Sequence, residues 1–161
     1  MSTMMRRMLG LVMLLSLCAV VRVSADLNDD QFDRFYKRYV GTWKANLAKS
    51  QYIVGGPPKE APSHTYSVVP GRKAIKYNGD TVHLLDGKDH PLSTKQPGST
   101  VAREVLDEFT VANTLKQDGK VTSRNTFVLS PDGRFAVMVF MNINERGEPT
   151  VRSLVYYDKV Q

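Results

Sequence analysis

Cysteine is nearly absent from this sequence. The 161-residue chain has one, Cys18, and it lies within an N-terminal apolar segment. A chain with a single cysteine cannot form an internal disulfide, so its stability must come from a packed core. Long hydrophobic runs are also missing, since the longest nearly unbroken apolar stretch, 8–21, has 14 residues. A helix that spans a bilayer needs about 20, so the sequence predicts no membrane span.

The N-terminus has the pattern of a secretory signal peptide. Arg6 and Arg7 precede the apolar stretch, and Val23-Ser24-Ala25 places small residues at a cleavage site. We therefore expect a signal peptide over 1–25 and a periplasmic or secreted domain over 26–161. Two alternatives are a retained membrane anchor and lipidation at Cys18, because 15–18 resembles a lipobox, although Leu17 is larger than the small residue usually found before the cysteine.

Clustered charge of one sign is absent as well. The formal net charge is +6, but loss of the three arginines in 1–25 leaves 19 basic and 16 acidic residues, a net charge of +3. The remaining basic residues are scattered along the chain, whereas nucleic-acid binding requires a clustered basic face. We therefore predict no nucleic-acid partner. The composition leaves the oligomeric state open.

Catalytic and metal-binding motifs are missing. The three histidines, His64, His83 and His90, lack the spacing of a compact metal site, although His64 and His83 can still meet across strands. The sequence contains no Gly-x-Ser-x-Gly elbow, no phosphate-binding P-loop and no Gly-x-Gly-x-x-Gly motif. We expect no enzymatic activity, no metal and no cofactor.

One amphipathic helix is predicted near 28–40. Aromatic residues recur there at helical spacing, at Phe32, Phe35, Tyr36 and Tyr39. Asn28 or Asp29 can cap the start of the helix, and Gly41 ends it. Two interpretations remain for the aromatic face: a helix packed over one end of a barrel, or a lid over a ligand.

The rest of the chain reads as short strands and tight turns. Strands are predicted at 42–48, 64–69, 73–77, 81–85, 100–106, 108–115, 121–129, 135–143 and 150–160. Asn78-Gly79 predicts a hairpin, and 86–91 is interpreted as a turn. Nearly every residue of 135–143 is apolar, which predicts a strand buried on both faces, with the helix against its outer face. We therefore predict an all-β, antiparallel up-and-down barrel of about eight or nine strands with one short N-terminal helix.

Several segments resemble a known group. Gly41-Thr42-Trp43-Lys44, followed by 48–50 and 55–58, resembles the opening of exported bacterial proteins with a lipocalin-like domain. Segments 86–91, 129–133 and 155–161 are similar to theirs too. The resemblance implies a lipocalin-like barrel, in a group of proteins most of which have no assigned activity. It also implies that Trp43, after Gly41, closes one end of the barrel beneath a basic residue of the last strand, for which Arg152 and Lys159 are the candidates.

Two strand arginines are the candidate ligand-binding residues. Arg103 and Arg124 lie among apolar or medium-sized neighbours, and a buried arginine requires an anionic partner. If both point inward, a small amphipathic or anionic molecule inside the barrel can supply that partner through bidentate hydrogen bonds, with Tyr66 and Tyr77 lining the cavity. If they point outward, they are ordinary surface arginines. The alternative function is a non-enzymatic envelope protein with a filled barrel that acts structurally or binds another protein.

Overall fold

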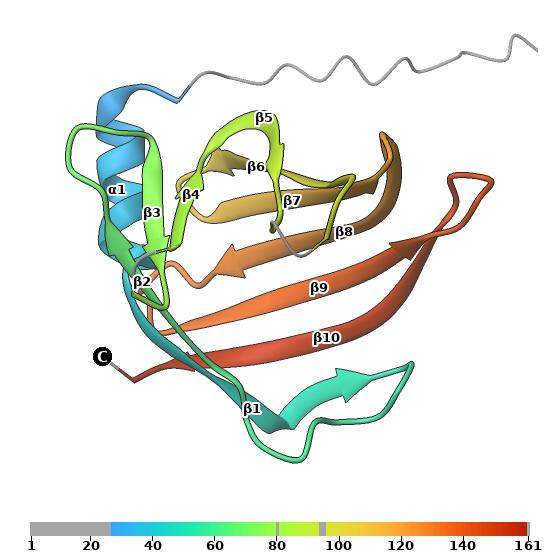
Figure 1. The fold of residues 1–161 in the computed structure, drawn as a ribbon. Helices are drawn as coiled ribbons and strands as arrows, with labels where there is room; N and C mark the ends of the chain where they lie inside the picture. The colour runs from blue at the N-terminus through green and yellow to red at the C-terminus, as the bar shows by residue number, and fades with distance from the viewer. Residues whose placement is uncertain (1–26, 80, 94–95, 161) are drawn as a thin grey trace, which may run out of the picture.

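The structure is a computed structural model that describes residues 27–79, 81–93 and 96–160. The predicted signal peptide and Cys18 lie outside the described residues. Within these ranges the fold is the predicted all-β one, a single antiparallel sheet with one short helix (Figure 1). The elements are α1 (Asp29–Tyr39), β1 (Gly41–Tyr52), β2 (Ser63–Val68), β3 (Ala74–Tyr77), β4 (Thr81–Leu84), β5 (Asp86–Pro91), β6 (Ser99–Asp107), β7 (Thr110–Gln117), β8 (Lys120–Leu129), β9 (Phe135–Ile143) and β10 (Pro149–Lys159).

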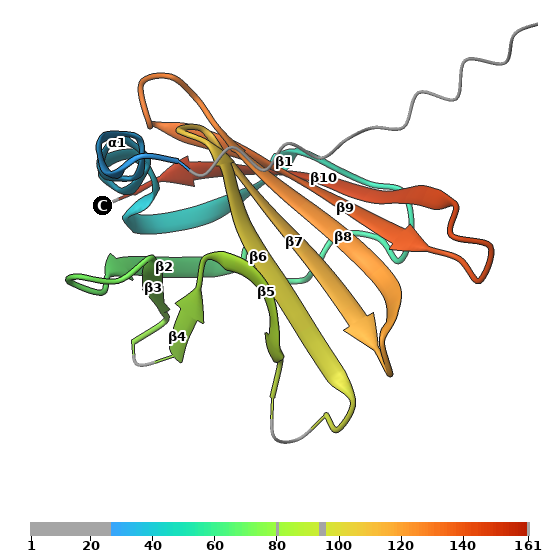
Figure 2. The same ribbon diagram turned by 90° about the horizontal axis from the view of Figure 1, so that it is seen from above.

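The strands form a nearly closed up-and-down barrel. Consecutive strands pair with each other except β4 and β5, and β1 also pairs with β10, giving the order β4-β3-β2-β1-β10-β9-β8-β7-β6-β5 in the described residues. The two edge strands of this sheet are β4 and β5, which follow each other in the chain but share no ladder in the described residues. Figure 2 shows how the sheet curves so that β2, β3 and β4 face the broad β6–β10 wall. The barrel is thus closed by β1–β10 and interrupted only between β4 and β5.

One strand was wrongly predicted as a turn. Segment Asp86–Pro91 is β5, paired with β6 from Asp86↔Glu104 to Pro91↔Thr100. Its register shifts between Asp86 and Asp89, and Gly87 has φ 70°. This bulge explains the turn-like sequence, because a β-bulge uses glycine at positive φ while the strand continues on either side.

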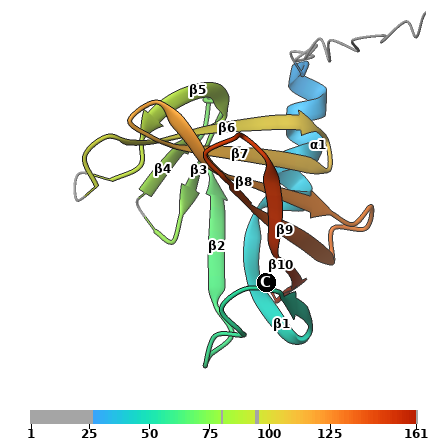
Figure 3. The ribbon, with the colours of Figure 1, turned by 90° about the vertical axis from the view of Figure 1, so that its right-hand side faces the viewer.

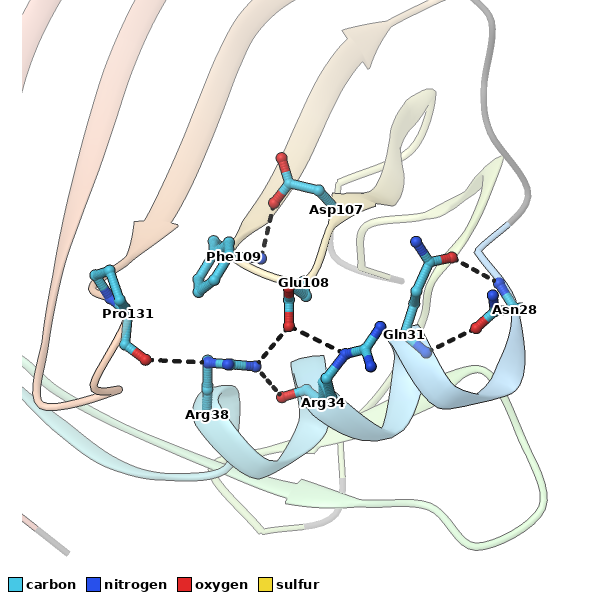
Figure 4. A network of polar contacts seen from close by, with 8 residues as sticks. All are labelled: Asn28, Gln31, Arg34, Arg38, Asp107, Glu108, Phe109 and Pro131. Carbon is cyan, nitrogen blue, oxygen red and sulfur yellow. Dashed lines mark hydrogen bonds and ion pairs between the residues drawn. The ribbon is translucent and has the colours of Figure 1, made fainter.

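The helix covers one end of the barrel, which we call the closed end (Figure 3). Asn28 and Gln31 form a reciprocal capping box at its start. At the closed end, Arg38 lies beside Glu108 of the β6–β7 turn, with 3.0 Å between Nη1 and Oε2, and its Nε donates to the carbonyl of Pro131 in the β8–β9 turn (Figure 4). On the other side of the helix, the Tyr36 hydroxyl donates to the carbonyl of Arg72 before β3. These contacts tie the helix to three turns.

The helix therefore does not cover the outer face of β9, as the sequence had suggested. Phe135 is 47% exposed on that strand, whereas Ala136 and Met138, its inward-facing residues, are buried. The prediction that β9 is buried on both faces is wrong, because the helical aromatic residues find their apolar partners inside the closed end. Phe35 and Tyr39 stack there with ring centroids 4.9 Å apart.

Trp43 lies at the centre of this closed end. Its side chain is fully buried, its Nε1 donates to the carbonyl of Tyr39 over 2.8 Å, and its ring meets Phe127 edge-on. The cation above it is Lys159, whose Nζ lies 5.3 Å from the ring centroid and also donates to the carbonyl of Arg38. Arg152, the other candidate, is exposed at the far end of β10. The register decides this outcome, because Trp43 pairs with Lys159.

Candidate functional site

A cavity of about 420 Å³ lies inside the barrel, above the closed end. This volume falls within the range of small-molecule sites, about 300–1,000 Å³. The cavity reaches the opposite end of the barrel, which we call the open end, at the exposed residues Thr81 and Leu92. Its lining combines apolar side chains with a few polar ones: Tyr39, His64, Tyr66, Ile75, Tyr77, Thr81, His83, Leu85, Leu92, Val101, Arg103, Val111, Asn113, Leu115, Asn125, Met138 and Phe140.

The polar groups on the β6–β8 wall lie side by side. Arg103 pairs with Asn113, and Asn113 pairs with Asn125. Directly opposed residues of an antiparallel sheet point to the same face, with Cβ atoms about 4.5–5.5 Å apart. Arg103, Asn113 and Asn125 therefore form one inward-facing row, which we call the polar row. In the described part of the chain, none of these three side chains makes a hydrogen bond to another residue.

Arg103 is half-buried in this cavity without a counter-charge. Burial lowers the pKa of its guanidinium, and the nearby Tyr39 and Tyr66 oppose that shift. The cavity lining contains no carboxylate among the residues that the structure describes. A cation taken from water without an acidic partner is energetically unfavourable, so the charge of Arg103 is uncompensated within the described cavity lining.

Tyr39 and Tyr66 add neutral hydroxyls near the guanidinium. Burial raises the pKa of Tyr39, and burial raises the pKa of Tyr66 to about 12. Both phenols are therefore protonated at neutral pH and can donate hydrogen bonds. Their rings lie 4.5 Å apart, which joins the helix to β2 at the floor of the cavity.

Arg124 does not line this cavity, so of the two directions left open for the arginines, the outward one applies to Arg124 and the inward one to Arg103. Arg124 pairs with Thr114, which pairs with Ala102, and all three lie on the outer face of the barrel. There Arg124 is exposed and borders an outer groove that also contains Glu104 and Lys116. The side-chain alternation of a strand gives the reason: Phe127 on the same strand points inward, so a residue three positions away points outward.

The wall formed by β2, β3 and β4, opposite the polar row, contains two histidines beside tyrosines. The Tyr77 hydroxyl lies 2.8 Å from Nδ1 of His64, and His83 stacks on the other side of Tyr77 with ring centroids 5.1 Å apart. Burial lowers the pKa of His64. Burial, reinforced by the charge of Arg103, lowers the pKa of His83 to about 4. Both imidazoles are neutral at pH 7, so Arg103 is the single full charge in the cavity lining described here.

A second cavity of about 480 Å³ adjoins the first. His64 and Phe140 line both. Its outer walls are the 54–58 loop and the exposed end of β10, and the Tyr52 hydroxyl beside it is buried without a hydrogen-bond partner. The two cavities thus share a wall at His64 and Phe140.

Sequence reasoning placed Arg103, Tyr66 and Tyr77 at the cavity wall, and the structure brings these three together. It missed Asn113, Asn125, His64 and His83. A usable signal existed for the two asparagines: each is a polar residue on a strand face whose other members, Val111 or Phe127, are buried apolar residues.

Other kinds of site find no support in the described ranges. No group of three histidine, cysteine, aspartate or glutamate side chains there is arranged to hold a metal ion. Among the same residues, no helix has the length and apolar character needed to cross a membrane. No model of a known protein family matches this chain, and the curated proteins include none similar to it.

Proposed function

We propose that this protein is an exported carrier that binds a small amphipathic anion inside its barrel. The observation that carries the proposal is Arg103, a half-buried guanidinium with no carboxylate in the surrounding cavity lining of the described chain. An arginine matches the planar geometry of a carboxylate or phosphate and can form two parallel hydrogen bonds to it. The apolar remainder of the lining suits the body of an amphipathic molecule.

A filled barrel that serves only as a structural or protein-binding module is the competing function. Two adjoining cavities of about 420 and 480 Å³ favour the carrier over that alternative. A stabilising interior arginine would be expected to pair with an acidic side chain, as Arg38 does with Glu108 at the closed end. Arg103 lacks such a partner within the described residues.

Native mass spectrometry of protein purified from the extracytoplasmic fraction tests the proposal by detecting a co-purified ligand. Isothermal titration calorimetry with straight-chain monocarboxylates then measures binding to the delipidated protein. We expect binding by the wild type and by Arg124→Met, and its loss in Arg103→Met. Arg124 is the matched control because it is an arginine on the same sheet that faces outward. Absence of binding by every acid, together with no co-purified anion, would refute the carrier function.

A further inference from the structure

The position of the polar row between the closed end and the open end of the barrel determines how a ligand would be oriented. Just below it, toward the closed end, a second inward row pairs Val105 with Val111, Val111 with Phe127, and Phe127 with Met138. These side chains are 5%, 2%, 1% and 8% exposed, so this layer is packed. On the β6–β8 wall, the polar row is therefore the polar layer that borders the packed row, on the same side of the cavity as Tyr39 and Tyr66 of its floor.

Above the polar row the wall is apolar, buried at Val101 (2% exposed) and exposed only near the open end. Val101 pairs with Leu115 on the inward face, and Leu92 reaches the open end with 37% of its side chain exposed. The chain from Arg103 to Ser99, where β6 begins, covers four residue steps, or about 13 Å at about 3.3 Å per residue. An alkyl chain of about ten carbons has a similar extended length.

From this layering we infer that the barrel takes a medium-chain monocarboxylate head first, with the carboxylate bound by Arg103, Asn113 and Asn125 and the alkyl chain directed toward the open end. The inference rests on the proposed carrier function and adds the class, length and orientation of the ligand. Asn113 and Asn125 act as specificity residues, because their amide groups can donate hydrogen bonds to the carboxylate oxygens that the guanidinium leaves free.

The reverse orientation leaves more polar groups unsatisfied. With the carboxylate at the open end, the alkyl chain would lie against the guanidinium of Arg103 and the amides of Asn113 and Asn125, and would give none of them a hydrogen bond. Buried polar groups without partners are unfavourable. The hydroxyls of Tyr39 and Tyr66 are both close enough to Arg103 to influence its pKa. In the reverse orientation they too would have no carboxylate to which they could donate a hydrogen bond.

Calorimetry with decanoate and decanol separates recognition of the head group from burial of the chain. Arg103→Met should weaken decanoate binding by about 100-fold, and Asn113→Leu and Asn125→Leu by about tenfold each, because hydrogen bonds to a charged group are stronger than those between neutral groups. Decanol binding should be unchanged or tighter in all three variants, which also verifies that they fold. Thr114→Val, the outward neighbour of Asn113, is the control and should bind decanoate as the wild type does.

Orientation is measured with undecanoate that carries a dansyl group on its terminal carbon. Head-first binding places the fluorophore at the open end, where acrylamide should quench it almost as well as in free solution. Strong protection from acrylamide, or wild-type decanoate affinity in both asparagine variants, would overturn the head-first inference while leaving the carrier function intact. If the wild type binds neither decanoate nor any other acid, the carrier function fails, and the inference fails with it.

Discussion

Replacing Arg103 with methionine should stabilise the protein when no ligand is present. The guanidinium is half-buried beside neutral tyrosines and a neutral histidine, and its lowered pKa reflects the cost of removing its charge from water. Full burial of an unpaired ion costs several kcal/mol. Water that enters through the open end screens part of this cost, which leaves about 1 kcal/mol in favour of methionine, a side chain of similar length and no charge.

Urea denaturation and thermal melting of the ligand-free protein measure this difference. For a domain of this size we expect the melting temperature to rise by about 3–5 °C. Arg124→Met, on the exposed outer face, should change the free energy of unfolding by less than about 0.5 kcal/mol. A ligand at 100 times its dissociation constant adds about 2.7 kcal/mol to the wild type, which exceeds the gain from methionine. The order of stability should therefore reverse when decanoate is added.

A lower stability of ligand-free Arg103→Met than of wild type would refute this reasoning. It would mean that the guanidinium makes a net favourable interaction inside the ligand-free barrel and is therefore not an unpaired group that an anion would stabilise. Equal destabilisation by both methionine variants would show in addition that the inward and outward faces of β6 and β8 are not energetically distinct.

The other predictions concern the closed end and the histidines. Trp43→Ala should lower the free energy of unfolding by about 3–5 kcal/mol, because it removes a fully buried indole and leaves a cavity; an unchanged melting temperature would contradict a structural role. Asn28→Ala should cost about 1 kcal/mol in urea denaturation by removing the capping box of α1, whereas no loss would show that the helix start does not limit stability. Since the pKa of His83 falls from 6.5 to about 4 on folding, the unfolded chain takes up the proton more readily. Its contribution to stability is full above about pH 6.5 and is lost as the pH falls toward 4. His83→Gln should flatten the stability profile in that window, and an unaltered profile would refute the assignment.

Local patterns in the sequence were sufficient for most elements of the fold. The aromatic spacing and Asn28 predicted a helix near 28–40, and the structure has one at Asp29–Tyr39 with Asn28 as its cap. Asn78-Gly79 predicted the hairpin that joins β3 and β4, and both residues have positive φ. Such features depend on hydrogen bonds and backbone preferences within a few residues, so they can be recognised without knowing the rest of the chain.

The alternation of apolar and polar side chains along single strands also indicates which arginine points inward, an indication that the prediction did not use. Val101 and Val105 lie on the same face as Arg103, and Phe127 lies on the face opposite to Arg124. Because large apolar side chains mark the interior face, this pattern alone distinguishes the inward arginine from the outward one. The same reasoning identifies Asn113 and Asn125 as polar residues on an interior face.

Only the tertiary structure decided which strands lie beside one another, and therefore which side chains from separate strands are neighbours. The register that aligns Arg103, Asn113 and Asn125 joins three separate strands, and the one that puts Lys159 over Trp43 joins the two ends of the barrel. The helix packs into the closed end rather than against β9 because the aromatic residues there, Trp43 and Phe127, come together only once the barrel has formed. Local sequence determined the elements and their inward faces, whereas long-range pairing determined the cavity, because a cavity depends on contacts between residues far apart in the chain.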